Sequence, residues 1–193
     1  MSRRTALAAP AALLLASGTA AGEEKQPTRS GARALVAYFS RSGNTRVIAG
    51  QLQRDLGADL FEILPAEPYP EDYEQTVEQA RRERDAGFRP ALKVTVPNIA
   101  QYDTIFLGFP IWGETAPPII RSFLVAHEMS GKSIRTFITH GGFGLGNSLS
   151  VLRDHAPRAR ILDAFSMEAD QERRTMNQVR DWLATIQVRD VHQ

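Results

Sequence analysis

Short, continuous apolar runs alternate along this chain with longer stretches in which apolar residues recur every three or four positions. A continuous run of about four to eight apolar residues indicates a strand buried on both faces, whereas the three-and-four spacing indicates one side of a helix. The runs predict strands at residues 34–39, 60–65, 103–109, 133–139 and 160–167. The helical spacing predicts helices at residues 45–56, 71–87, 117–128, 146–156 and 171–187.

Two of these helices have further recognisable features. Gly57 follows the helix at 45–56 and is expected to cap its end with a left-handed backbone. In the charged helix at 71–87, Glu78 and Arg82 are four residues apart and can pair on its surface. Because acidic residues are interleaved with the arginines of this helix, we expect the arginine cluster to face solvent rather than to form a binding patch.

Strict alternation of strands and helices defines the fold class. It predicts an α/β protein with a five-stranded, doubly wound parallel sheet and helices on both faces. We expect one domain over residues 32–188 and a short tail at 189–193. In such sheets ligands bind beyond the carboxyl ends of the strands, where the strand order reverses. The loops after the first, third and fourth strands are therefore the expected place for a binding site.

The loop after the first strand, SRSGNT, has the composition of a phosphate site. Ser40, Ser42 and Thr45 supply hydroxyl groups, and Gly43 lets the backbone come close to a ligand. The helix that follows offers unpaired N–H groups and the positive end of its dipole. Together these features can hold a phosphate without a lysine. A plain turn before a capped helix is the alternative interpretation.

The loops after the third and fourth strands, GFPIWGETAPP and THGGFGLGN, suggest a flat ligand. Trp112 lies between Pro110 and Gly113, where it can form a wall against a planar ring. The alternative is that Trp112 folds back into the core. The glycines of the second loop let main-chain amides approach a ligand, although a mobile loop would also explain them. His140 is a candidate proton donor beside such a ligand, or a structural loop histidine.

Composition excludes several classes of function. The chain has no cysteine, so disulfides, thiolate metal sites and cysteine nucleophiles are absent. It has 23 basic and 22 acidic residues, a formal charge of +1, which argues against a nucleic-acid partner. The remaining histidines, His127, His155 and His192, have no metal-ligand spacing. We therefore predict no metal site, and no catalytic residue apart from the candidate His140.

The first part of the chain has the pattern of an export signal. Within residues 1–22, Arg3 and Arg4 come first, an Ala/Leu-rich stretch too short to span a bilayer follows, and small residues end it near Ala21. The arginine pair is similar to a twin-arginine signal. Residues 23–31 are expected to form a linker. We expect a periplasmic protein with no stable membrane span after cleavage; the alternative is a cytoplasmic protein with a disordered tail.

The three loops, each in its place after a strand, resemble those of the flavodoxin family over roughly residues 34–186. The resemblance implies strand order 2-1-3-4-5 and bound FMN. The fourth-strand loop lacks the aromatic and acidic character that is common in shuttle flavodoxins. Carried over by position, the resemblance implies a phosphate cradle of Ser40, Arg41, Ser42, Gly43, Asn44 and Thr45, and an isoalloxazine flanked by Pro110, Ile111, Trp112 and Gly113 on one side and by His140, Gly141, Gly142, Phe143 and Gly144 on the other.

Three functions are compatible with this resemblance. The first is a flavodoxin-like redox protein that transfers electrons to or from an unidentified partner, a protein or a small quinone. The second is an FMN-dependent NAD(P)H:quinone oxidoreductase, and the third a binding module without redox use. The near-neutral charge weakens the first, because shuttle flavodoxins are strongly acidic, whereas export favours it, because soluble nicotinamides are held in the cytosol.

Overall fold

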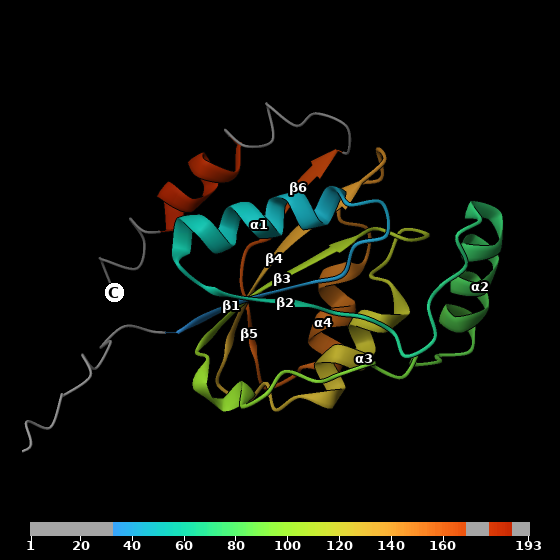
Figure 1. The fold of residues 1–193 in the computed structure, drawn as a ribbon, viewed down its shortest axis with the longest axis horizontal. Helices are drawn as coiled ribbons and strands as arrows, with labels where there is room; N and C mark the ends of the chain where they lie inside the picture. The colour runs from blue at the N-terminus through green and yellow to red at the C-terminus, as the bar shows by residue number, and fades with distance from the viewer. Residues whose placement is uncertain (1–32, 169–177, 187–193) are drawn as a thin grey trace, which may run out of the picture. The chain divides into compact units, whose positions relative to one another are not determined.

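The computed structural model describes residues 33–168 and 178–186 (Figure 1). Its centre is a parallel sheet in the order β2-β1-β3-β4-β5, with β6 also paired to β4. This confirms the predicted fold class and strand order. The expected signal, linker and tail, and residues 171–177 of the last predicted helix, lie outside the described residues. The strands are β1 (Ala34–Tyr38), β2 (Asp59–Glu62), β3 (Thr104–Pro110), β4 (Ser133–His140), β5 (Arg160–Ile161) and β6 (Phe165–Glu168).

The fifth predicted strand is divided in two. Ile161 of β5 pairs with Ile134, and Phe165 of β6 pairs with Phe137, both in parallel. Four residue steps on this edge therefore oppose three steps on β4, which leaves one extra residue, as in a bulge. Asp163 stands in the gap, and aspartate is depleted in strands. A single strand over 160–167 was thus the wrong expectation, although both halves lie where it was placed.

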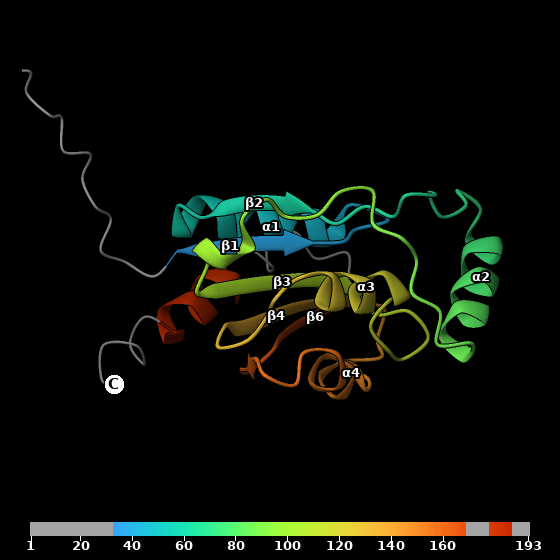
Figure 2. The same ribbon diagram turned by 90° about the horizontal axis from the view of Figure 1, so that it is seen from below.

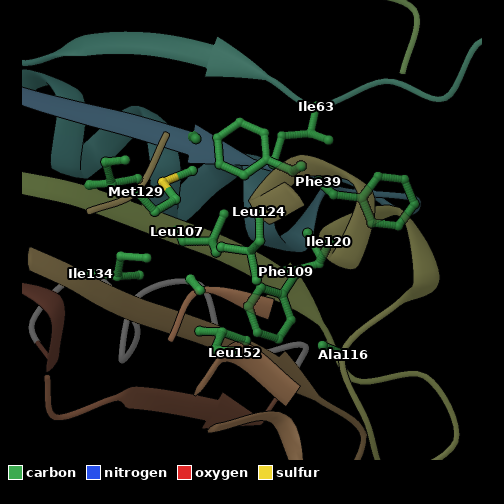
Figure 3. Packing of buried hydrophobic residues seen from close by; sticks show 14 of the residues in the cluster. Phe39, Ile63, Leu107, Phe109, Ala116, Ile120, Leu124, Met129, Ile134 and Leu152 are labelled. Atoms are coloured by element: carbon green, nitrogen blue, oxygen red, sulfur yellow. The ribbon is translucent and has the colours of Figure 1, made fainter. Parts of the chain in front are cut away.

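Helices cover both faces of the sheet. The helices α1 (Asn44–Leu56) and 178–186 pack on one face, and α3 (Pro118–Ala126) and α4 (Ser148–His155) pack on the other (Figure 2). Successive residues of β1 point to opposite faces, so Val36 contacts the α1 side and Ala37 the α3 side. Figure 3 shows part of the larger cluster, in which Phe109 of β3 lies near Ile120 and Leu152.

The first helix ends as the sequence predicts. Gly57 has φ 59°, in the left-handed region, and its N–H donates to the carbonyl of Gln53. Ile48 and Leu52 form the buried side of α1, against the sheet. The cap and this buried side fix α1 against the sheet. Its first turn, directly after β1, is therefore held at the carboxyl edge of the sheet.

The helix α2 (Tyr73–Asp85) does not cover either face. It stands beyond the carboxyl ends of the strands (Figures 1 and 2), where it contacts α3. Asp72 caps its start by accepting from the N–H of Gln75 at 2.9 Å. The expected pair of Glu78 and Arg82 is present at 3.4 Å. The chain then returns to β3 through a 3-10 turn at Ile99–Gln101.

Two negative findings concern the residues that the structure describes. No helix in this part of the chain is long and apolar enough to cross a bilayer. The same residues contain no group of three His, Cys, Asp or Glu side chains arranged to hold a metal ion.

Candidate functional site

A cavity of about 640 Å³ opens at the carboxyl edge of the sheet. That volume lies within the range of roughly 300–1,000 Å³ typical of small-molecule sites. Its walls come from the loops after β1, β3 and β4 and from α2. The lining residues are Arg41 and Ser42; Pro110, Ile111, Trp112, Gly113 and Glu114; Gly141 and Phe143; and Tyr73, Thr76, Val77, Ala80, Arg81 and Arg84.

The loop after β1 presents main-chain amides at the start of α1. Gly43 has φ 97°, a left-handed conformation that favours glycine, and its N–H donates to the Ser40 hydroxyl at 3.1 Å. The first bond of the helix runs from the Val47 N–H to the Gly43 carbonyl, at 3.1 Å. The amides of the three residues between them therefore have no acceptor within α1, as an anion site requires.

Thr45 is not among the described residues that line the cavity. Its side chain is buried, and its hydroxyl lies 2.9 Å from the hydroxyl of Thr139 on β4, where either group can donate. The bond joins the start of α1 to the end of β4. The sequence predicts that the Thr45 hydroxyl contacts a phosphate. In the structure it is bonded to Thr139 in the core. The phosphate contact stays a prediction.

Trp112 has one side in the core and the other on the cavity wall. Its ring meets Phe39 edge-on, with centroids 5.2 Å apart, and meets Tyr69 edge-on at 4.9 Å. The main-chain N–H of Trp112 donates to the carbonyl of Thr115 at 3.0 Å, which closes the loop behind the ring. The half-buried indole combines both interpretations of the sequence, because it packs on the core and still lines the cavity.

Tyr69 connects this aromatic cluster to α2. Its hydroxyl donates to the carboxylate of Glu83 at 2.8 Å, and Gln79 donates to the same carboxylate at 2.8 Å. Burial, followed by the bond to Glu83, raises the pKa of Tyr69, so the phenol stays protonated and remains a donor. The contacts of Tyr69 therefore hold α2 in a fixed place beside Trp112.

Arg41 makes a second connection between α2 and the loops. Its guanidinium donates to the carbonyl of Glu71 at 2.7 Å and lies 5.7 Å from the centre of the Tyr73 ring. Arg41 and Ser40 also line a smaller hollow of about 380 Å³, on the side of Pro68. The loop after β1 therefore separates two hollows, and α2 closes the larger one.

The loop after β4 contributes Gly141 and Phe143 to the cavity. It is joined to the loop after β3 by a bond from the Asn147 N–H to the Glu114 carbonyl, at 3.0 Å. His140 ends β4, and its Nδ1 accepts from the Gly142 N–H at 3.1 Å, which leaves Nε2 to carry the proton of a neutral ring. The described lining residues do not include His140, so its role as a proton donor stays a prediction.

The wall formed by α2 is the part of the cavity that the sequence did not predict. We expected the arginines of this helix to face solvent, and for Arg84 this was wrong: its side chain is 32% exposed and lines the cavity, whereas that of Arg82 is 66% exposed. The sequence does contain a pattern for this wall, because the lining residues from Tyr73 to Arg84 recur every three or four positions. The charged residues between them make that pattern hard to recognise.

The cavity and its surroundings define a class of protein: a single, doubly wound α/β domain with a ligand site at the switch point of its sheet. A family model described as flavodoxin matches residues 33–186. The chain therefore belongs to the flavodoxin family. No curated protein matches it. Membership of the family identifies FMN as the cofactor.

Solved structures agree with this family. A candidate flavoprotein from Bacteroides eggerthii DSM 20697 is 34% identical, with a TM-score of 0.71 over 81% of this chain and 98% of that one. Another, from Bacteroides uniformis ATCC 8492, is 29% identical, with a TM-score of 0.71 over 80% and 99%. A flavoprotein in complex with FMN, from Lactobacillus acidophilus NCFM, shares the fold at 19% identity, with a TM-score of 0.64 over 70% and 93%.

The residues of the site fit a flavin phosphate and ring. Beside Gly43, a Cβ atom would meet nothing within 4 Å, so space for a ligand lies against the backbone there. The first amides of α1 offer donors to an anion, and the cavity offers the apolar surfaces of Pro110, Ile111 and Trp112 to a ring.

Proposed function

We propose that this protein is an FMN-dependent redox protein that transfers electrons to or from a partner, either another protein or a small quinone. The observation that most supports this is the convergence of three loops on one cavity, which is lined by Trp112 and by Ser42, two residues before the start of α1. When bound, FMN supplies the redox chemistry, since its ring takes up and releases electrons. The protein's part is to bind, orient and shield it.

In this proposal the loop after β1 holds the phosphate. The amides at the start of α1 donate to its oxygens, helped by the helix dipole. The Ser40 hydroxyl already accepts the Gly43 N–H, so its own proton is free to be donated outward. Ser42 is exposed and lines the cavity, where its hydroxyl can donate as well.

The ring is proposed to lie between the loops after β3 and β4. Trp112 is held edge-on by Phe39 and Tyr69, so it offers a rigid surface for stacking. Gly141 and Phe143 stand on the loop after β4, and α2 limits the access of water from outside. The predicted contacts of His140, Gly142 and Gly144 with the ring remain part of this proposal.

A second candidate is an FMN-dependent NAD(P)H:quinone oxidoreductase. The size of the cavity and the arginines on its α2 wall favour it, because a second, anionic molecule must then bind beside the flavin. The sequence favours electron transfer instead, since none of its glycine-rich loops has the spacing of a dinucleotide fingerprint.

One experiment separates these functions. The purified protein is examined by absorption spectroscopy, the apo-protein is titrated with FMN, and the loaded protein is mixed with NADPH in a stopped-flow instrument. We expect a bound-flavin spectrum and slow or no reduction by NADPH alone. Fast reduction followed by quinone turnover would establish the oxidoreductase, and failure to bind FMN would reject both functions.

The proposal includes the compartment. The pattern of residues 1–22 supports export of the protein to the periplasm by a twin-arginine route, with cleavage near Ala21. Retention in the cytoplasm is the alternative.

A further inference from the structure

The cavity carries more positive than negative charge. Among the described residues that line it, Arg41, Arg81 and Arg84 are cationic and Glu114 is acidic, so the charge of the lining is +3 − 1 = +2. A cleft lined mainly by one sign of charge concentrates ligands of the opposite sign. This net charge favours an anion.

The two arginines on α2 are not needed for the phosphate of FMN. In the proposed function that phosphate lies at the start of α1, on the loop after β1. Arg81 and Arg84 come from α2, and Arg84 is placed beside Gly113 on the loop after β3. The anion that they favour is therefore a second one.

Arg84 forms part of the cavity wall and packs against the loop after β3. Its Nη1 atom lies over the main chain of Gly113, where any Cβ would overlap it. Gly113 has φ 58°, in the left-handed region that favours glycine, and its lack of a side chain leaves room for the guanidinium. The Nε atom of Arg84 donates to Asp85 at 2.9 Å, and Arg81 pairs with Glu78 at 2.8 Å. Such pairs near the surface are weak, so they yield to a bound anion.

The mouth of the same cavity is apolar. Tyr73 and Val77 are one turn apart on α2 and are 65% and 46% exposed, while Phe143 on the loop after β4 is 67% exposed. All three line the cavity. Exposed apolar side chains gathered at a cavity mouth indicate an apolar or aromatic ligand.

We propose that the α2 side of the cavity binds a planar aromatic anion, such as a carboxylate or sulfonate on a fused ring system, beside FMN. The rings lie against Tyr73, Val77 and Phe143, and the anionic group pairs with Arg81 and Arg84. This inference rests on the proposed function and gives the small-molecule partner a chemical class.

Binding is tested with two probes that differ in charge. The FMN-saturated protein is titrated by calorimetry with naphthoate and with naphthamide, its uncharged counterpart. We expect naphthoate to bind at least about tenfold more tightly, because only it pairs with the arginines, and we expect this advantage to shrink at high salt. Equal affinities for the two probes would overturn the proposal.

Variants of α2 locate the site. Arg81→Gln and Arg84→Gln should each weaken naphthoate binding by about five- to twentyfold and leave naphthamide unchanged, as expected for the loss of one charge-assisted bond. Arg82→Gln is the matched control, because Arg82 belongs to the same helix and is not among the described lining residues. Phe143→Ala should weaken both probes. A loss in Arg82→Gln equal to that in Arg84→Gln would contradict the assignment.

Two further outcomes separate this inference from the proposed function. Displacement of FMN by naphthoate would show one shared site and would overturn the inference while the FMN function stands. If the protein does not bind FMN, the same titrations are made on the protein alone. Binding that depends on Arg81 and Arg84 would then support the anion site without the redox function, and binding that does not depend on them would reject both.

Discussion

At the residue scale, two glycines at opposite ends of α1 offer a matched test of the phosphate loop. Gly43 and Gly57 both have left-handed backbone, and a Cβ would meet nothing within 4 Å at either. We expect Gly43→Ala and Gly57→Ala to lower the free energy of unfolding by similar amounts, about 1–2 kcal/mol, in chemical denaturation. Only Gly43→Ala should also weaken FMN binding, because it moves the amides that begin α1. Unchanged affinity for FMN in Gly43→Ala would remove this loop from the site.

The hydroxyl pair of Thr45 and Thr139 separates a structural role from a binding role. Thr45→Val leaves the buried Thr139 hydroxyl without its partner, so we expect a loss of about 1–3 kcal/mol in the free energy of unfolding. Adding Thr139→Val removes both polar groups and should recover part of that loss. FMN titrations of the same proteins are the second measurement. Affinity that falls in Thr45→Val but not in Thr139→Val would support the predicted phosphate contact; equal affinities would contradict it.

Trp112 should report the arrival of the flavin ring. We expect its fluorescence to be quenched when FMN binds, and Trp112→Ala to weaken binding by about 1–3 kcal/mol. Trp182 is the internal control, because it stacks on Phe165, on the opposite face of the sheet from the Trp112 cluster. Quenching that persists undiminished in Trp112→Ala would show that Trp182 is the reporter and that Trp112 does not touch the ring.

At the element scale, the position of α2 depends on a few side chains. Tyr69→Phe removes the bond to Glu83 and leaves that buried carboxylate with Gln79 as its remaining described donor. We expect a loss of about 1–2 kcal/mol in the free energy of unfolding, faster dissociation of FMN and faster hydrogen exchange in α2. Tyr73→Phe is the control, because the described bonds of Tyr73 do not involve its hydroxyl. Equal exchange rates in the two variants would show that Tyr69 does not hold α2.

The sequence predicts best the strands that have apolar neighbours on both faces of the sheet. The strands β1, β3 and β4 are buried on both faces, so their apolar runs are continuous and their positions follow directly. The loops of the site follow in turn, since each begins where such a strand ends. The place of α2 depends instead on contacts between residues distant in the sequence, such as Arg41 with Tyr73 and Tyr69 with Glu83. Hydrophobic periodicity along the chain does not predict such contacts.

At the scale of the whole molecule, balanced charge conceals an uneven distribution. The formal charge of the chain is +1, yet the described lining of the cavity alone carries +2. An acidic surface around a flavin disfavours an added electron, and cations near the ring have the opposite effect. The cationic lining of the cavity therefore supports the anionic partner proposed above, whereas the formal charge of the whole chain gives no sign of it.

Cofactor binding and export also have to be compatible in the whole protein. A flavin held by three loops is best inserted into the folded domain in the cytosol, where FMN is made, and the twin-arginine route carries folded proteins. We therefore expect a cleaved periplasmic protein that already contains FMN. Replacing Arg3 and Arg4 with lysine should leave FMN-loaded precursor in the cytosol, as measured by fractionation and flavin fluorescence. Equal periplasmic amounts of the variant would indicate a general secretory signal, and uncleaved wild-type protein confined to the cytosol would reject export and favour the quinone oxidoreductase.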